Sequence, residues 1–283
     1  MNAPRERRIA LPRLALAALE WGDPAAPALV ALHGWLDNAG SFAALAPLLV
    51  PHYRVVALEL PGHGHSGHLP AGADYHYLDH VRAVLAALDV LELPRGRLLG
   101  HSLGAGIASL VAAAAPERIE RLWLIEGLGP LGDDGTHTLQ RYRDALAAPP
   151  ADGKTLRVFR DADQAARARA MASGLDARLA RPIVERGLRE VEGGWQWRSD
   201  PRLVRPSAIR LAETQIRALL AGIEAPAALL LSQPATPYLP AAMMRERAAC
   251  VPRIAVEHLA GGHHLQLEHP QAVAQWMLRH TTA

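Results

Sequence analysis

The chain has 283 residues, of which 50% are hydrophobic and 20% are charged, and this size suits one globular domain with a large core. Its 30 basic and 28 acidic residues leave a formal net charge of +2. Because the arginines are scattered among carboxylates, there is no basic block for nucleic acid to bind, and we expect no such partner. The single cysteine, Cys250, excludes an intrachain disulfide and a cysteine-based metal site.

The beginning of the chain partly resembles a secretory signal, because three arginines precede the apolar run 14–19. That run is short, Pro12 interrupts the pattern before it, and Glu20 ends it. We therefore interpret it as a strand and expect a cytoplasmic protein, as the lone cysteine also suggests. No apolar stretch approaches the roughly 18 to 20 residues that span a bilayer, so we expect no membrane span.

Short apolar runs alternate with helical patterns through the first half, which is typical of βαβ units in a mostly parallel sheet. The predicted strands cover residues 9–21 (as one or two strands), 28–32, 53–60 and 97–99. The predicted helices between them cover residues 42–49 and 78–91. A helix of small residues to about 115 and a buried strand over 121–125 follow.

The pattern changes between about residues 130 and 210, where the sequence is rich in Arg and Ala, helical in period, and broken by Pro and Gly pairs. Strand signals return at 227–231 and 254–259, and the amphipathic run 271–278 comes last. We predict that residues 1–129 and 211–283 form the core and that residues 130–210 form a helical insertion.

The strongest local motif is Gly100-His101-Ser102-Leu103-Gly104, which matches G-x-S-x-G and lies between a predicted strand and a predicted helix. A nucleophilic serine in this position occupies a strained turn, and the two glycines remove side chains that would collide with the neighbouring strand or helix. The alternative is a serine that only caps an ordinary helix.

A serine hydroxyl is a weak nucleophile that needs a base within hydrogen-bond reach and a group that orients the base. The segment 259–266 follows the last predicted strand and offers His263 or His264 as this base. Their adjacency also allows a metal interpretation, but neighbouring residues rarely point at one ion and no acidic or cysteine ligands stand nearby, so we expect no metal site.

The oxyanion of an acyl-transfer intermediate needs preorganised N–H donors. The backbone of Leu103, directly after the serine, is one candidate. The second is the N–H of Trp35, in the His33-Gly34-Trp35-Leu36 segment that follows the strand at 28–32. The alternative interpretation of that segment is a simple turn that ends the strand.

Taken together, these motifs resemble the α/β-hydrolase superfamily and, within it, the serine hydrolase-like proteins. The resemblance rests on residues 31–39, on Pro-Gly-His-Gly-His-Ser at 61–66, on the serine turn, and on Gly-Gly-His at 261–263. It implies a mostly parallel eight-stranded sheet with helices on both faces, a helical cap inserted after the sixth strand, and no cofactor. It also makes His263 the base, with Glu268 and Pro270 behind it, and leaves His264 without a role in proton transfer.

The usual acid of the family follows the strand that here covers 227–231, yet no Asp or Glu occurs between Glu224 and Glu246. The superfamily has an alternative position at the end of the preceding strand, where this sequence carries Glu126. A carboxylate at the end of a buried apolar strand is costly unless it is paired, and an imidazolium is a fitting partner. The alternative interpretation of Glu126 is a carboxylate that caps a helix or lies at the hinge of the cap. Asp133 and Asp134, in a glycine-rich loop, are weaker candidates for the acid.

Two functions follow from these residues. The first is a cofactor-free serine hydrolase of the carboxylesterase type that forms an acyl-enzyme on Ser102, with esters ahead of thioesters, lactones, amides and carbon–carbon bonds. The second is a binding protein that keeps the fold without turnover, which the missing acid favours. We expect a small-molecule acyl substrate with an apolar acyl or alcohol group, contacted by Trp35 and His101. The oligomeric state cannot be inferred.

Overall fold

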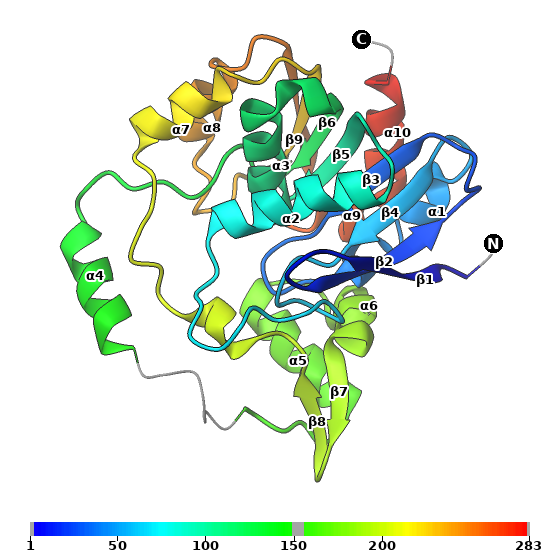
Figure 1. Cartoon of the computed structure of the whole chain (residues 1–283), viewed down its shortest axis with the longest axis vertical. Coiled ribbons are helices and arrows are strands. Elements are labelled where there is room, and N and C mark those ends of the chain that lie inside the picture. Colours follow the sequence, from blue (N-terminus) through cyan, green and yellow to red (C-terminus); the bar gives the residue numbers. More distant parts are fainter. Residues whose placement is uncertain (1–2, 149–155, 282–283) are drawn as a thin grey trace.

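The computed structural model of the chain describes residues 3–148 and 156–281 and contains one eight-stranded sheet with the strand order β1-β2-β4-β3-β5-β6-β9-β10 (Figure 1). The strands are β1 (Arg5–Ala10), β2 (Ala15–Trp21), β3 (Ala28–Leu32), β4 (Arg54–Leu58), β5 (Gly96–His101), β6 (Ile119–Ile125), β9 (Ala227–Gln233) and β10 (Ile254–Ala260). Strand β2 is antiparallel to β1 and β4, and all other pairs are parallel. The predicted fold class is confirmed.

Both faces of the sheet are buried, which explains the continuous apolar runs of its central strands. In β3, Val30 and Leu32 belong to one core cluster and Leu29 and Ala31 to the other. The first cluster includes residues of α2 (Tyr77–Val90), α3 (Leu103–Ala114), α7 (Glu213–Leu220) and α8 (Ala241–Ala248). The second includes residues of η1 (Ala39–Phe42), α1 (Ala46–Leu49), α9 (Leu265–Glu268) and α10 (Pro270–Arg279).

A separate group of elements follows β6, and residues 159–197 of this group pack around a third apolar cluster. It comprises α4 (Thr138–Ala147), α5 (Ala162–Ser173), α6 (Ala177–Gly187), the hairpin of β7 (Leu188–Val191) and β8 (Gly194–Trp197), and η3 (Pro201–Val204). We call these elements the cap. Figure 1 places α5, α6 and the hairpin together at one end of the molecule.

Two local predictions were wrong in part. The cap was expected to be helical, but Glu192 and Gly193 form the turn of a hairpin, and Gly194 begins its second strand; the two glycines have φ of 82° and 144°. The helix expected over 42–49 is divided between η1 and α1. Pro47 lies in the first turn of α1, where its missing N–H is tolerated, whereas inside a continuous helix it would remove a hydrogen bond.

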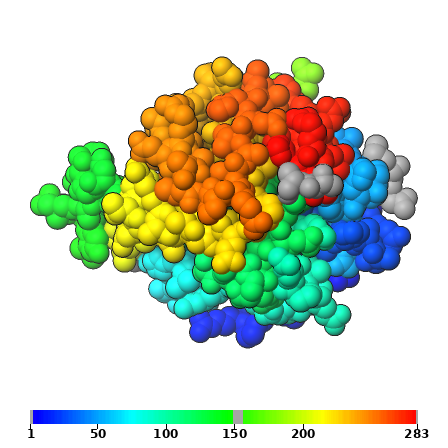
Figure 2. Space-filling model, turned by 90° about the horizontal axis from the view of Figure 1, so that it is seen from above, coloured from blue at the N-terminus to red at the C-terminus, as the bar shows by residue number. Residues whose placement is uncertain are grey.

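Helix α4 stands apart from the body of the protein, as Figure 2 shows, and none of its residues is buried. Among the described residues, no helix is long and apolar enough to cross a membrane.

Candidate active site

Ser102 lies between β5 and α3 in a strained turn, with φ of 52° and ψ of −113°. Its backbone N–H donates to the carbonyl of Ile125 at 2.9 Å, which ties the turn to the end of β6. A Cβ on Gly100 would lie 2.5 Å from the Cα of Ala105, and one on Gly104 would overlap the carbonyl oxygen of Leu32. The two glycines are therefore required by close backbone approach, for the reason inferred from the motif.

Glu126 follows β6 directly and is brought to His263 from 137 positions away in the sequence. Glu126 has φ of 52°, and its N–H donates to the carbonyl of Leu230 at 2.9 Å. The Nδ1 of His263 lies 3.0 Å from Glu126 Oε2, at hydrogen-bond distance. The Glu126 side chain is 1% exposed, whereas that of His263 is 13% exposed. This pair can hold an imidazole with its Nε2 available for proton transfer.

The end of β9 and the loop after it, where the usual acid is missing, supply hydrogen-bond donors to Glu126 instead. The backbone N–H of Ser232 donates to Oε1 at 2.5 Å, and the hydroxyl of Thr236 donates to Oε2 at 3.1 Å. Sequence analysis did not single out Thr236. The signal that could have identified it is its place in the loop where the family's acid normally lies.

The two expected oxyanion donors have unoccupied backbone N–H groups. Neither Trp35 N–H nor Leu103 N–H donates a hydrogen bond to any other described residue. The turn that carries Trp35 is closed by a 3.1 Å hydrogen bond from Asp37 N–H to the Gly34 carbonyl, and Leu36 adopts a φ of 58°. The Trp35 indole is half exposed, and its Nε1–H donates to the carbonyl of Leu203 in the cap at 3.1 Å.

His101 is buried beneath the loop that carries His263, with 1% of its surface exposed. Because a carbonyl can only accept, His101 must donate from Nε2 to the His263 carbonyl, 2.8 Å away. Burial, followed by the neighbouring His263 and His264, lowers the pKa of His101 well below its ordinary value, so the ring is neutral. This position suits support of the loop, and we do not retain His101 as a substrate contact.

Asp37 is a buried carboxylate that sequence reasoning did not single out. It accepts from Ser41 Oγ at 3.3 Å, faces His264 Nε2 at 3.4 Å, and forms an ion pair with Arg169 of α5. Burial alone would raise the pKa of Asp37, but His264, Arg169 and His101 outweigh it and hold the pKa far below its ordinary range. Asp37 is therefore ionised.

Asp37, His101 and His264 place their donor atoms within 4.8 Å of one another, a spacing that could hold a metal ion. The guanidinium of Arg169 on the same carboxylate already supplies the compensating positive charge.

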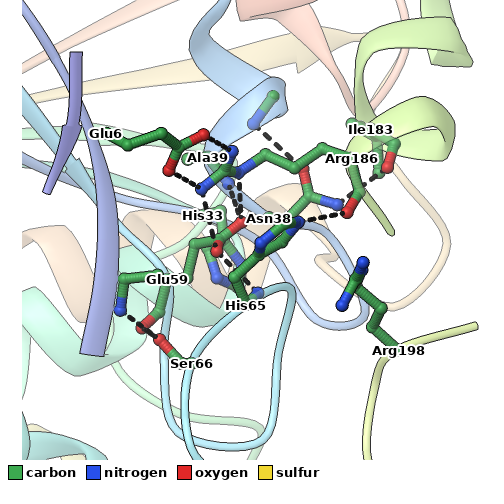
Figure 3. Close-up of polar contacts among 12 residues, drawn as sticks. Glu6, His33, Asn38, Ala39, Glu59, His65, Ser66, Ile183, Arg186 and Arg198 are labelled. Atoms are coloured by element: carbon green, nitrogen blue, oxygen red, sulfur yellow. Dashed lines mark hydrogen bonds and ion pairs between the residues drawn. The ribbon is translucent and has the colours of Figure 1, made fainter. Parts of the chain in front are cut away.

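A second buried carboxylate, Glu59, fastens the cap to the core (Figure 3). Arg186 of α6 lies between Glu59 and Glu6, with its Nε 2.7 Å from Glu59 Oε1 and its Nη1 2.6 Å from Glu6 Oε1. Asn38 donates from Nδ2 to the Ile183 carbonyl at 2.7 Å, beside the same contact. The cap thus rests on the Trp35–Asn38 segment and on Glu59, next to the candidate catalytic residues.

Comparisons with known proteins agree with this architecture. A family model described as alpha/beta hydrolase fold matches residues 27–218. The chain is similar to a serine hydrolase-like protein of Danio rerio, at 29% identity over 96% of this chain and 87% of that protein. It is also similar to a probable serine hydrolase of Drosophila melanogaster, at 30% identity over 97% of this chain and 86% of that protein.

Among solved structures, a hypothetical protein of Pseudomonas aeruginosa PAO1 superposes with a TM-score of 0.88, at 38% identity over 99% of this chain and 98% of that one. The glycine-bounded serine turn, the paired carboxylate and imidazole, and these matches lead to one assignment: the chain belongs to the α/β-hydrolase family.

Proposed function

We propose that this protein is a cofactor-independent serine hydrolase that cleaves carboxylic esters through an acyl-enzyme on Ser102. The observation that carries the proposal is the 3.0 Å contact between His263 Nδ1 and the buried Glu126 carboxylate, in the same site as a strained serine between β5 and α3. A nucleophile, a base and an acid that orients the base are the three parts that acyl transfer needs.

In the proposed reaction, Ser102 Oγ attacks the ester carbonyl while its proton passes to His263 Nε2. The N–H groups of Trp35 and Leu103 stabilise the oxyanion of the tetrahedral intermediate. When this intermediate collapses, the carbon–oxygen bond to the alcohol breaks and His263 gives the proton to the departing oxygen. Water then attacks the acyl-enzyme by the same route and releases the acid and the free serine.

Glu126 fixes the tautomer of His263 that these reaction steps require. With a hydrogen on Nδ1 donated to the carboxylate, Nε2 of the neutral imidazole is an acceptor and can take the serine proton. The negative charge also stabilises the imidazolium that forms in the transition state. The Ser232 N–H and the Thr236 hydroxyl hold the carboxylate in this orientation.

The cap, predicted from the sequence to span residues 130–210, is proposed to enclose the substrate. Its contacts with Trp35 and Asn38 support this role, because they join the cap to the loop that carries one oxyanion donor.

Hydrolysis of p-nitrophenyl esters of graded chain length tests the proposal, with labelling by a fluorophosphonate probe as an independent measure of the serine. We expect Ser102→Ala to abolish labelling and to lower kcat by about 10⁶-fold, and Glu126→Gln to lower kcat by about 10⁴-fold. Asp134→Asn, which removes an exposed carboxylate between β6 and α4, is the matched control and should retain activity. A folded wild-type protein that neither reacts with the probe nor hydrolyses any ester would favour the binding-protein alternative.

A further inference from the structure

A cavity of about 270 Å³ lies between the segment 36–38 and the inner side of the cap. Its lining includes Leu36, the residue after Trp35, and the Trp35 N–H is a proposed oxyanion donor. An acyl chain bound to Ser102 could therefore extend into the cavity. Its volume is just below the roughly 300–1,000 Å³ that is usual for sites of drug-sized ligands. The occupant is therefore a small group.

The walls of the cavity are mainly apolar and are held in place by the cap hairpin. Phe159 and Trp197 meet edge to face, with ring centroids 5.4 Å apart, and Leu36 and Ile183 complete the apolar lining. Phe159 is fixed by two backbone hydrogen bonds with Trp195, of 2.7 and 2.8 Å. The aromatic wall is thus preformed.

Two guanidinium groups also line this cavity. Arg169 uses one terminal nitrogen to bind Asp37, but its Nε is buried and donates to no acceptor among the described residues. Because this Nε is fully buried, a ligand in the cavity does not contact it. Arg157 lies over the face of Phe159, 4.9 Å from the ring centroid, and has no carboxylate partner in the described part of the chain.

The charges of the residues that line the cavity indicate the net charge of the ligand. Among the described residues that line the cavity, Asp37 is the one carboxylate and it is paired with Arg169, so the exposed Arg157 has no carboxylate partner among them. A single negative charge on the ligand restores balance. A dianion such as a phosphate monoester would leave an excess negative charge close to the ionised Asp37.

We infer that this cavity binds an acyl chain that has an apolar middle and one carboxylate at its far end, which is held by Arg157. This inference rests on the proposed function, because it places the ester end of the same molecule at Ser102. It also revises the apolar acyl or alcohol group expected from the sequence: the apolar walls remain, but Arg157 adds recognition of a charge.

Binding to the Ser102→Ala protein tests the inference without requiring turnover. Calorimetry would compare monomethyl adipate with methyl hexanoate, which share a six-carbon acyl chain and differ in the terminal carboxylate. We expect monomethyl adipate to bind at least about tenfold more tightly, which corresponds to about 1.4 kcal/mol. Arg157→Met should remove this preference and leave the binding of methyl hexanoate unchanged.

Arg160→Met is the matched control, because Arg160 is an exposed neighbour that pairs with Asp161 and does not line the cavity. It should keep the preference. Ala172→Phe, which places a large side chain into the lining, should weaken the binding of both ligands. Equal affinity for the two ligands, no binding of either, or a preference that survives Arg157→Met would each overturn the inference.

The two proposals can fail separately. If the wild-type protein hydrolyses esters through Ser102 but shows no carboxylate preference, the proposed function stands and the assignment of the cavity is wrong. If the Ser102→Ala protein binds monomethyl adipate through Arg157 but the wild type hydrolyses no ester, the cavity assignment stands and the hydrolase proposal is wrong.

Discussion

Arg169 of the cap helix α5 forms an ion pair with Asp37, the buried carboxylate in the loop after β3. Asp37 also faces the Nε2 of His264, the residue next to His263. One carboxylate therefore contacts both the cap and the loop that carries the candidate base. This arrangement links the position of the cap to the geometry of the candidate catalytic histidine.

We predict that Arg169→Met destabilises the protein by about 3–5 kcal/mol, because it leaves Asp37 buried without the guanidinium with which it forms an ion pair. Urea unfolding at neutral pH would measure the change. Arg167→Met, on the exposed side of the same helix, should stay within about 0.5 kcal/mol of wild type. The double variant Asp37→Asn with Arg169→Met should recover part of the loss, since no charge is then left unpaired. Equal stabilities of the two single variants would show that the ion pair contributes nothing.

The hydroxyl of Thr236 gives a second prediction. It donates to the same Glu126 oxygen that faces His263, so its removal allows the carboxylate to rotate and misalign the imidazole. We expect Thr236→Val to lower kcat by about tenfold, as for one hydrogen bond to a charged group, with little change in KM. Thr236→Ser should restore most of the rate.

Ser232→Ala is the control for this prediction. The Ser232 hydroxyl donates to the Pro234 carbonyl, whereas its contribution to Glu126 comes from the backbone N–H, which the substitution keeps. Steady-state kinetics of both variants on one ester would separate the two effects. A Thr236→Val enzyme with the kcat of wild type would exclude a positioning role for the hydroxyl.

The sequence was most informative where function depends on local backbone geometry. Gly100 and Gly104 identify the serine turn because a Cβ at either position would collide with backbone, and this constraint acts over a few residues. Glu126 could be inferred because a charged residue at the end of a buried strand needs a partner. Its contact with His263 at 3.0 Å agrees with that reasoning.

Contacts between distant segments could not be predicted in the same way. Nothing in the sequence distinguishes Arg169 from the other arginines of the cap, because its role depends on how α5 packs above Asp37. The cap hairpin was missed because its strands have only four residues each and its two glycines were interpreted as helix breakers. The support of Glu126 by Thr236 requires knowledge of how the loop after β9 folds back.

A third prediction concerns the glycine beside Glu59. Gly64 and Gly72 both have positive φ, of 53° and 81°, so alanine at either position adopts a strained backbone. A Cβ on Gly64 would overlap the Glu59 carboxylate, which cannot move away because Arg186 and the His65 N–H hold it. A Cβ on Gly72 would contact nothing within 4 Å.

We therefore expect Gly64→Ala to cost about 1–3 kcal/mol more than Gly72→Ala, as overpacking of a buried site does. Urea unfolding of the two variants measures the difference directly, since the backbone strain is common to both. If the two variants are equally stable, the carboxylate of Glu59 is free to shift and does not hold the cap rigidly.

The last prediction comes from histidines buried between the sheet and α2. His33 and His63 have ring centroids 5.0 Å apart, and His63 and His80 are 6.2 Å apart. Burial, followed by the positive charge that His33 would carry, lowers the pKa of His80 to about 4. The pKa values of His33 and His63 are also lowered, again mainly by burial. These rings are neutral in the folded protein at neutral pH.

An unfolded chain protonates such a histidine near its ordinary pKa of 6.5, whereas folded His80 does not until about pH 4. The stabilisation that this difference represents is present above pH 6.5 and is lost as the pH falls toward 4, because the unfolded state then binds more protons. At pH 5, the loss attributable to His80 is about 2 kcal/mol.

His80→Phe keeps a ring stacked on Tyr75 and removes the titration. Unfolding free energies at pH 7 and pH 5 should therefore differ by about 2 kcal/mol less in the variant than in wild type. An identical pH dependence of the two proteins would mean that His80 titrates alike in the folded and unfolded states.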